Sequence, residues 1–389
     1  MPVKSFVCLA TPFAVLSLAA NAAAQWTVTN LHPAGAVQSG AWTVNAGQQG
    51  GWAVVDGVVV ACLWSGSAAS WTSLHPSDMS ASQIKCLIAA QQAGYVDVGF
   101  GEPHAALWSG TSSWIDLNPA FASASEIVAI AGGQQVGTTQ LFGNSHASLW
   151  TGSAASWIDL KPAGIAYSGA NATNGSQQGG WVLLSGTSLA SMWSGSAESW
   201  VSLHPSGATG STIMAMSDTK QAGSVEWGGP SHACIWSGTP ESCVDLHPPV
   251  AAESSARAIS GDTQAGYTVV DDVIRAAAWI GTPESWIDLH ALLPADFSSS
   301  QATGAWTGPA GISICGWGFN QSTGHQEALL WTLPNCTADF NHDGFVNGDD
   351  YDAFASLFES ADLGADINHD SFVNGDDYDA FASAFEAGC

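Results

Sequence analysis

The sequence predicts a seven-bladed β-propeller followed by a small helical module, and three observations lead to this prediction. Most of the chain is a 43-residue repeat made of short strand-like segments. The repeat region begins and ends with complementary fragments of one repeat. An acidic loop pattern then occurs twice near the C-terminus, each time before aromatic residues at helical spacing. The expected fold class is therefore mainly β with a helical C-terminal module.

Three sequence markers recur with the period of the repeat. A leucine, usually followed by a polar residue and proline, occurs at Leu31, Leu74, Leu117, Leu160, Leu203, Leu246 and Leu289. A Gln-x-Gly motif ends at Gly51, Gly94, Gly137, Gly180, Gly223 and Gly266, with a looser copy near Gly311. A tryptophan after an aliphatic residue appears at Trp64, Trp108, Trp150, Trp193, Trp236, Trp279 and Trp331. The segments between markers indicate roughly four short strands per repeat, which is the size of one propeller blade.

The ends of the repeat region favour a ring over a linear solenoid of stacked hairpins. The region opens at the strand of Leu31, in the middle of a repeat, and closes with the strand of Trp331. A ring needs such complementary ends to hide its edge strands, whereas a solenoid needs two capping units. We therefore expect a propeller over residues 25–335 whose closing blade takes its last strand from the N-terminus.

The tryptophan marker carries a histidine in three repeats, which read His104-Ala-Ala-Leu-Trp108, His146-Ala-Ser-Leu-Trp150 and His232-Ala-Cys-Ile-Trp236. Together with the Asp-Leu and Gln-x-Gly motifs that follow, these segments resemble the HAF repeat of extracellular bacterial proteins. The resemblance implies an extracellular repeat domain and no particular activity. Other repeats lack the histidine, so it is not an obligatory ligand.

A second tryptophan position suggests two readings. It is occupied by Trp71, Trp114, Trp157, Trp200 and Trp286. Exposed indoles would suit a carbohydrate-binding lectin, whereas buried ones would fill the wedges between blades. Cys243 and Val28 occupy the same position in two repeats and favour packing.

Polar residues of the repeat are interpreted as structural. One set, just before a loop, consists of His75, His204, His247 and His290. Asn118 and Lys161 replace the histidine in two repeats, which disfavours a metal ring. A second set consists of Asp116, Asp159, Asp245 and Asp288, each at one strand position. This regularity indicates a repeat element and no catalytic pair.

The sequence contains no recognisable catalytic constellation. It has no Gly-x-Ser-x-Gly elbow, phosphate loop or dinucleotide fingerprint. Only Arg257 and Arg275 are arginines, too few for a sialidase-type site. We expect a non-enzymatic binding protein, with a polysaccharide-degrading enzyme or a lectin as the alternatives.

The acidic loops have the spacing of a calcium loop. Oxygen ligands at loop positions 1, 3, 5, 9 and 12, with a backbone carbonyl at 7, wrap Ca²⁺. In the first loop these positions hold Asp339, Asn341, Asp343, Asn347 and Asp350, with the carbonyl of Phe345. In the second they hold Asp366, Asn368, Asp370, Asn374 and Asp377, with the carbonyl of Phe372. A disordered acidic tail is the alternative, but it would not duplicate aromatic residues at helical spacing.

The duplicated segment, residues 336–389, resembles a type I dockerin domain in the variant that ends in Gly-Cys on bacterial surface proteins. The resemblance implies two bound calcium ions, pseudo-twofold packing of the halves, and attachment to a cohesin-like or cell-surface partner. It also implies an anchoring role for Cys389. Ser371 stands where the first loop has Gly344, so the second calcium site is expected to be weaker.

The N-terminus has the features of a secretory signal peptide. Lys4 precedes an apolar run and a small-residue stretch, and cleavage is expected after Ala24. No later segment is long and apolar enough for a transmembrane helix. The signal peptide, residues 1–24, predicts an extracellular or cell-surface location.

Seven cysteines follow the signal peptide. Near neighbours in the sequence suggest pairs of Cys62 with Cys86, Cys234 with Cys243 and Cys315 with Cys336, although six cysteines allow fifteen connectivities. Cys389 is then the odd thiol.

The charge excludes one class of partner. The formal charge is −27, with six Lys and Arg in the whole chain. So few cations cannot neutralise a phosphate backbone, which excludes nucleic-acid binding. A glycan ligand remains compatible with this composition.

Overall fold

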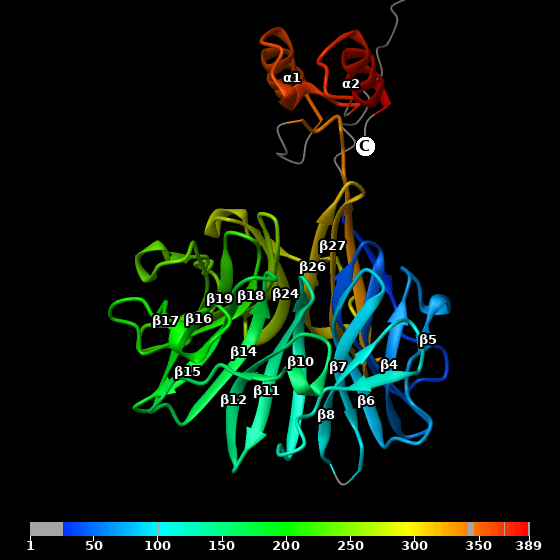
Figure 1. Ribbon diagram of the computed structural model, residues 1–389. Helices are drawn as coiled ribbons and strands as arrows, with labels where there is room; N and C mark the ends of the chain where they lie inside the picture. Colours follow the sequence, from blue (N-terminus) through cyan, green and yellow to red (C-terminus); the bar gives the residue numbers. More distant parts are fainter. Residues whose placement is uncertain (1–25, 100, 341–345, 369, 388–389) are drawn as a thin grey trace, which may run out of the picture. The chain divides into compact units, whose positions relative to one another are not determined.

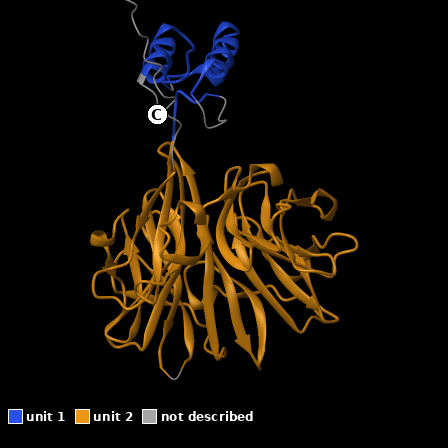
Figure 2. Cartoon of the chain, turned by 180° about the vertical axis from the view of Figure 1, so that it is seen from behind, with its two compact units in different colours: residues 1–25, 335–389 blue, residues 26–334 orange. Residues whose placement is uncertain are grey.

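The computed structural model describes residues 26–99, 101–340, 346–368 and 370–387. The chain divides into two compact units, one of residues 26–334 and one that contains residues 335–389 (Figure 2). The expected signal peptide, residues 1–24, lies outside the described residues. No helix among the described residues is long and apolar enough to cross a membrane.

The first unit consists of seven four-stranded antiparallel sheets, which confirms the predicted seven-bladed propeller (Figure 1). The first strands of the blades are β2 (Ser39–Asn45), β6 (Ala81–Ile88), β10 (Ala124–Ala131), β14 (Tyr167–Thr173), β18 (Gly210–Met216), β22 (Glu253–Ser260) and β26 (Phe297–Gly308). The second strands are β3 (Gln48–Val55), β7 (Gln91–Asp97), β11 (Gln134–Leu141), β15 (Gln178–Leu184), β19 (Gln221–Glu226), β23 (Thr263–Val270) and β27 (Gly311–Asn320).

The outer half of each blade is shorter. The third strands are β4 (Val58–Trp64), β8 (Pro103–Trp108), β12 (Asn144–Trp150), β16 (Thr187–Trp193), β20 (Ser231–Trp236), β24 (Val273–Ile280) and β28 (His325–Pro334). The fourth strands are β5 (Thr72–Ser73), β9 (Trp114–Asp116), β13 (Ile158–Asp159), β17 (Val201–Ser202), β21 (Val244–Asp245), β25 (Ile287–Asp288) and β1 (Thr27–Asn30). Single turns of 3₁₀-helix, η1 (Ala68–Ser70), η2 (Ala154–Ser156), η3 (Ala197–Ser199), η4 (Pro240–Ser242), η5 (Pro283–Ser285) and η6 (His290–Leu292), lie in the connections.

The ring closes as the sequence predicts. Each first strand contacts the first strands of both neighbouring blades, so these strands form the centre of the propeller. In the closing blade β1 pairs antiparallel with β28, with Thr27 opposite Thr332 and Asn30 opposite Leu329. The N-terminal strand β1 therefore completes the seventh sheet, so β28 is not left as an exposed edge strand.

The Gln-x-Gly motif has a structural cause in every blade. The first strand of each blade contains a β-bulge, and the motif's glycine on the second strand lies beside it. A Cβ on Gly137, for example, would collide with the carbonyl oxygen of Glu126. In the seventh blade the equivalent glycine is Gly316, whose Cβ would collide with the carbonyl oxygen of Gln301. The expected copy near Gly311 is therefore wrong, because β26 and β27 are longer than the other first and second strands.

The glutamine and tryptophan markers stabilise the same region. The Gln135 amide oxygen accepts a hydrogen bond of 2.7 Å from the Gly152 nitrogen, in the turn after Trp150. Five other blades repeat this contact, from Gln49, Gln92, Gln178, Gln221 and Gln264. The marker tryptophans are at most 1% exposed in all seven blades. They supply the largest buried surfaces of the blades.

A buried serine joins each pair of neighbouring blades. Ser168 at the start of β14 accepts a 2.9 Å hydrogen bond from the Ala147 nitrogen on β12, a strand of the preceding blade. The same contact is made by Ser39, Ser82, Ser125, Ser211, Ser254 and Ser300. All seven blade interfaces, including the one that closes the ring, therefore share one polar contact.

None of the three suggested pairs of cysteines is a disulfide. Cys62, Cys86 and Cys315 are free thiols, so the pairs of Cys62 with Cys86 and Cys315 with Cys336 are wrong. Cys62 and Cys86 belong to different core clusters, which keeps them apart. Burial raises the pKa of Cys62 to about 12 and therefore disfavours its reactive thiolate.

The third suggested pair, Cys234 with Cys243, is also wrong as a disulfide, because both residues are free. Their thiols hydrogen bond to each other, as expected for residues at the two ends of one hairpin. Cys336 is disulfide-bonded. Since all other described cysteines are free, its partner lies outside the described residues.

The described residues of the second unit form two helices, α1 (Gly348–Glu359) and α2 (Gly375–Ala387), and the short η7 (Leu363–Ala365). Phe354 and Phe381 stack with ring centroids 4.2 Å apart. The Tyr351 and Tyr378 hydroxyls are 3.2 Å apart. Both pairs join residues 27 positions apart, so equivalent residues of the two halves contact each other. Contacts between equivalent residues are the signature of a twofold arrangement.

Candidate functional site

The second acidic loop is held together by its own backbone. The Asp366 carboxylate accepts hydrogen bonds from the Asp370 nitrogen at 3.1 Å and the Ser371 nitrogen at 2.8 Å. The Asp377 carboxylate, at the start of α2, accepts from the Asn368 nitrogen at 3.2 Å and the Asn374 nitrogen at 2.8 Å. The carboxylates at the first and last positions of the loop therefore hydrogen bond to backbone nitrogens between them.

Two further side chains of this loop follow the same pattern. The Asn368 side-chain oxygen accepts from the Asp370 nitrogen, and the Asp370 carboxylate accepts from the Phe372 nitrogen. Donation from the backbone, foremost from the Asn374 nitrogen, lowers the pKa of Asp377. The carboxylate is therefore held in its charged form, which is the form that binds a cation.

The first loop is described only at its ends. The Asp350 carboxylate is buried and accepts a 2.8 Å hydrogen bond from the Asn347 nitrogen, as Asp377 does from Asn374. Asp339 is also buried. The predicted ligands Asn341, Asp343 and the carbonyl of Phe345 lie outside the described residues, as does Cys389.

The second loop has the donor types that a hard cation prefers, although its described carboxylates do not converge on one point. Their side chains offer only oxygen, from three carboxylates and two amides, and each carboxylate oxygen keeps a lone pair beyond its hydrogen bond. Ser371 has a φ of 72°, the left-handed conformation that the glycine of such a loop supplies. Within the described residues no three His, Cys, Asp or Glu side chains form a cluster of metal-binding geometry.

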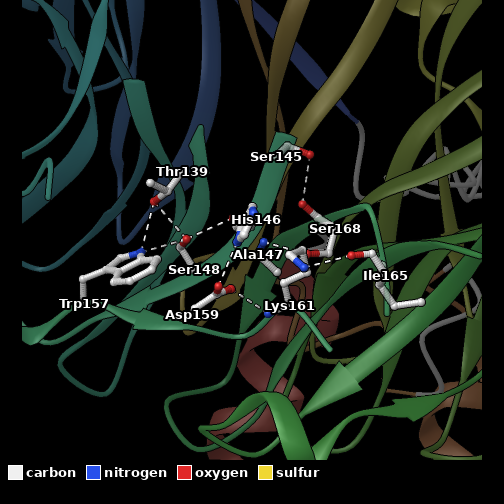
Figure 3. A network of polar contacts seen from close by, with 10 residues as sticks. All are labelled: Thr139, Ser145, His146, Ala147, Ser148, Trp157, Asp159, Lys161, Ile165 and Ser168. Atoms are coloured by element: carbon white, nitrogen blue, oxygen red, sulfur yellow. Dashed lines mark hydrogen bonds and ion pairs between the residues drawn. The ribbon is translucent and has the colours of Figure 1, made fainter. Parts of the chain in front are cut away.

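The repeated aspartates of the propeller pair with basic residues on the neighbouring strand (Figure 3). His146 Nδ1 lies 2.8 Å from the Asp159 carboxylate, which also accepts a 2.9 Å hydrogen bond from the Lys161 nitrogen. The same pairing joins His104 to Asp116, His232 to Asp245 and Arg275 to Asp288. These carboxylates therefore connect the outer strands of one blade, and the histidine of the HAF-like marker has a structural partner.

The second histidine set contacts the serines between blades. His75 Nδ1 lies 2.8 Å from Ser82 Oγ, and His32, His204, His247 and His290 repeat this contact. In one blade Asn118 takes the place of the histidine and accepts a 2.6 Å hydrogen bond from Ser125. The interpretation of these histidines as structural agrees with these contacts.

We expect the propeller to lose stability as the pH falls from 7 towards 5. Burial lowers the pKa of His75, His247 and His290, and the nearby Asp78 and the Met79 carbonyl only partly offset this effect at His75. A histidine in the unfolded chain has a pKa of about 6.5. At a pH below this value the unfolded chain therefore binds more protons than the folded chain. The free energy of unfolding is therefore highest above that pH and decreases as the pH falls below it.

His75→Asn tests this expectation, because Asn118 already serves at the same repeat position. Thermal unfolding from pH 7 to 5 should show a smaller loss of stability for the variant than for the wild type. Equal losses would show that His75 does not contribute.

The tryptophans of the second repeated position are half-buried. Trp71, Trp114, Trp157, Trp200 and Trp286 each pack against a core cluster. Trp157 Nε1 also donates hydrogen bonds to Thr139 and Ser148, at 3.1 and 3.0 Å (Figure 3). The preferred interpretation as packing residues agrees with these contacts, although the position is less buried than expected.

Sequence reasoning missed a ring of seven residues at the centre of the propeller. Each is the extra residue of the bulge in a first strand, and the ring consists of Trp42, Lys85, Val128, Asn171, Met214, Arg257 and Thr303. All seven line a central cavity of about 350 Å³. We call this set the bulge ring. The first six lie at steps of 43 residues, the one signal in the sequence that marks them.

Two larger pockets share residues with the bulge ring. The first, of about 530 Å³, contains Trp42, Trp52, Lys85, Tyr95 and Glu126, and also Gln83 and Asp97. The second, of about 510 Å³, contains Trp181, Glu226, Arg257 and Tyr267, and also Asn171, Thr212 and Met214. Trp52 and Trp181 are three repeats apart, as are Asp97 and Glu226. The two pockets are therefore equivalent sites on one end of the propeller; we call them pocket A and pocket B.

Comparisons with known proteins identify the fold and no family. No protein-family model matches the sequence, and no curated protein matches it. A puromycin hydrolase mutant complexed with PGG has a TM-score of 0.52 at 12% identity, over 78% of this chain and 59% of that chain. A puromycin-hydrolyzing peptidase of Mycobacterium tuberculosis has a TM-score of 0.51 at 12% identity, over 79% and 56%. This chain thus spans less than two thirds of either protein.

An oligogalacturonate lyase of Vibrio parahaemolyticus is similar over almost its whole length. Its TM-score is 0.50 at 10% identity, over 79% of this chain and 94% of that chain. At such identities the likeness shows a shared propeller fold alone.

Proposed function

We propose that the protein is an exported binding protein whose propeller carries the ligand sites and whose C-terminal module binds two calcium ions and attaches the chain to a partner. One observation carries this proposal: most recurring polar side chains of the propeller serve its own structure, and the side chains free for a ligand gather in pockets A and B. The repeated histidines and aspartates form hydrogen bonds within the propeller, so these side chains serve its structure.

Calcium binding by the module is supported by the second loop. Asp366, Asp370 and Asp377 supply carboxylates, Asn368 and Asn374 supply amide oxygens, and the Phe372 carbonyl completes the set. When bound, the ion would neutralise carboxylates that otherwise repel one another. The first loop would use Asp339, Asn341, Asp343, Asn347 and Asp350 with the Phe345 carbonyl in the same way.

Attachment through a cohesin-like or cell-surface partner is supported by the dockerin resemblance. The paired helices present Gly348 and Asp349 on one half and Gly375 and Asp376 on the other, which gives two equivalent faces. Anchoring through Cys389 requires a free thiol. A bond between Cys389 and the disulfide-bonded Cys336 would exclude that role, and peptide mass spectrometry without reduction distinguishes the two.

Calcium-dependent attachment to the cell envelope tests the proposal. The purified full-length chain should bind envelope fragments of its source organism in 2 mM Ca²⁺, a concentration of the order that extracellular calcium modules require. EGTA should abolish this binding, and so should Asp366→Ala combined with Asp339→Ala. Asp379→Ala, an exposed carboxylate outside the ligand positions, is the matched control. Binding that is equal with and without calcium would refute the attachment role.

A lectin and a polysaccharide-degrading enzyme remain the alternatives for the propeller. The aromatic residues of pockets A and B favour a glycan ligand, and Asp97 and Glu126 place two carboxylates in one pocket. The enzyme alternative also agrees with the fold, since the oligogalacturonate lyase is a propeller. Release of new reducing or unsaturated ends from a polysaccharide panel would establish an enzyme, whereas binding without turnover would establish a lectin.

A further inference from the structure

The cations of the propeller fall into two groups. Lys220 forms an ion pair of 2.6 Å with Asp262, Arg275 pairs with Asp288, and Lys161 donates to the Ile165 carbonyl. Lys85 and Arg257 have no ion pair with a carboxylate among the described residues. Both belong to the bulge ring. Lys161 also lacks a carboxylate partner but donates to a backbone carbonyl, so the two cations that have neither contact among the described residues line the same cavity.

Each of these cations is held against aromatic rings. Lys85 Nζ lies 4.5 Å from the ring centroid of Trp42 and 5.8 Å from that of Tyr95. The Arg257 guanidinium lies 5.3 Å from the centroid of Tyr267. Arg257 Nε is buried and has no hydrogen-bond partner among the described residues. Ring contacts fix the positions of both charges and leave donor groups for another acceptor.

Carboxylates stand near these cations without pairing with them. Glu126 lies close enough to Lys85 to raise its pKa, although burial of Lys85 lowers that pKa more. Burial, together with Glu126 and Asp97, raises the pKa of Tyr95. Pocket A thus combines one cation, two carboxylates and aromatic rings. Pocket B has a similar composition, with Arg257, Glu226, Trp181 and Tyr267, but its cation comes from a different blade position, because Met214 stands there at the repeat position of Lys85.

This combination selects a class of ligand. Aromatic rings pack on the apolar faces of sugars, and carboxylates accept hydrogen bonds from sugar hydroxyls. A single desolvated cation per pocket matches one negative group per sugar, whereas a densely charged polyanion would be repelled by the neighbouring carboxylates. A neutral sugar would offer Lys85 and Arg257 only hydroxyl and ring oxygens, whereas a carboxylate gives the stronger, charge-assisted hydrogen bond.

We propose that pockets A and B bind uronic acid residues of an acidic polysaccharide, with Lys85 and Arg257 each receiving a sugar carboxylate. The two pockets at one end of the propeller would hold two residues of one chain, or of two chains, and so raise avidity. This inference deepens the proposed binding function and rests on it. It is independent of the calcium module.

Binding of defined oligosaccharides to the full chain tests the proposal. Hexamers of mannuronic, guluronic and galacturonic acid are titrated by calorimetry and by tryptophan fluorescence, beside neutral hexamers of mannose and galactose and a sulfated hexamer. At least one uronate hexamer should bind at least about tenfold more tightly than the neutral hexamers, and added salt should weaken it.

Three substitutions locate the site. Lys85→Met and Arg257→Met place at these positions the residue that the bulge ring already has at Met214, so folding should be retained. Each should weaken uronate binding about tenfold or more, and the double substitution should abolish it. Lys220→Met removes the same charge outside the pockets and should bind as the wild type does.

Several outcomes would overturn the inference. These are equal affinity for neutral hexamers, tighter binding of the sulfated hexamer, wild-type affinity in the double variant, or no binding to any uronate. A chain that still attaches to the envelope in a calcium-dependent manner but fails these titrations would refute this inference and leave the attachment role intact. A chain that binds uronates without such attachment would do the opposite.

Discussion

Removal of calcium should unfold the C-terminal module and leave the propeller folded. Thirteen carboxylates and no Lys or Arg follow Cys336, so nothing within this segment neutralises the charge. The helices α1 and α2 have 12 and 13 residues, lengths at which isolated helices are marginal in water. Their shared core is small, with Phe354, Ala365 and Phe381 as the buried residues. If the module binds calcium as proposed, we therefore expect ion binding to supply much of its folding free energy.

Circular dichroism and limited proteolysis measure this effect. With excess EGTA the helical signal should fall and residues 346–387 should become cleavable, whereas the strand signal of the propeller should persist. Asp366→Ala should raise the calcium concentration needed for protection, and Asp379→Ala should not. Ser371→Gly should lower that concentration, because glycine adopts a φ of 72° without strain. An unchanged helical signal and unchanged protease resistance in EGTA would contradict the expectation.

The architecture of the propeller was predictable because its markers have simple physical causes. The marker tryptophans are buried in every blade, and each motif glycine lies where no Cβ fits. Because each blade needs these residues at the same positions, their spacing of 43 residues gives the length of one blade. The sequence did not predict Gly316, because the longer strands of the seventh blade move this glycine away from the 43-residue spacing.

The sequence also contains a pattern that predicts the polar pairs of the propeller. In the repeats with Asp116, Asp159 and Asp245 the third strand carries a histidine, whereas in the repeats with Ser73 and Ser202 the position of the histidine holds Val60 and Leu189. The charged residue and its partner thus change together between repeats. Comparison of the repeats with one another predicts these contacts without any other sequence.

The bulge ring was harder to predict. A bulge inserts one residue into a strand and interrupts the alternation of inward and outward side chains. A regular strand pattern therefore does not show that Lys85 and Arg257 line the central cavity. The side chains of the ring also differ from blade to blade, so no shared residue type marks this position in the repeat.

The closing strand gives the second large expected effect. Deletion of residues 26–31 should remove cooperative folding of the propeller. Leu31 is fully buried, Val28 packs against the cluster of Trp331, and the Asn30 side chain donates a 2.7 Å hydrogen bond to the buried Glu327 carboxylate. Burial of one such aliphatic side chain contributes about 1.5–3 kcal/mol. Leu31, the half-buried Val28 and the polar contact together therefore make up a substantial share of the stability of a typical domain, which is about 5–15 kcal/mol.

A graft separates loss of the strand from loss of chain length. The deleted residues 26–31, inserted after Pro334 through a short glycine linker, should restore the antiparallel pairing with β28. Thermal unfolding followed by the near-ultraviolet signal of the tryptophans should then regain a single transition, which the deletion variant lacks. Asn30→Asp within the graft should weaken the rescue by placing a second carboxylate beside Glu327, and Glu327→His should restore it by recreating the pair of His146 and Asp159. A deletion variant that unfolds at the wild-type temperature would show that the ring does not depend on its N-terminal strand.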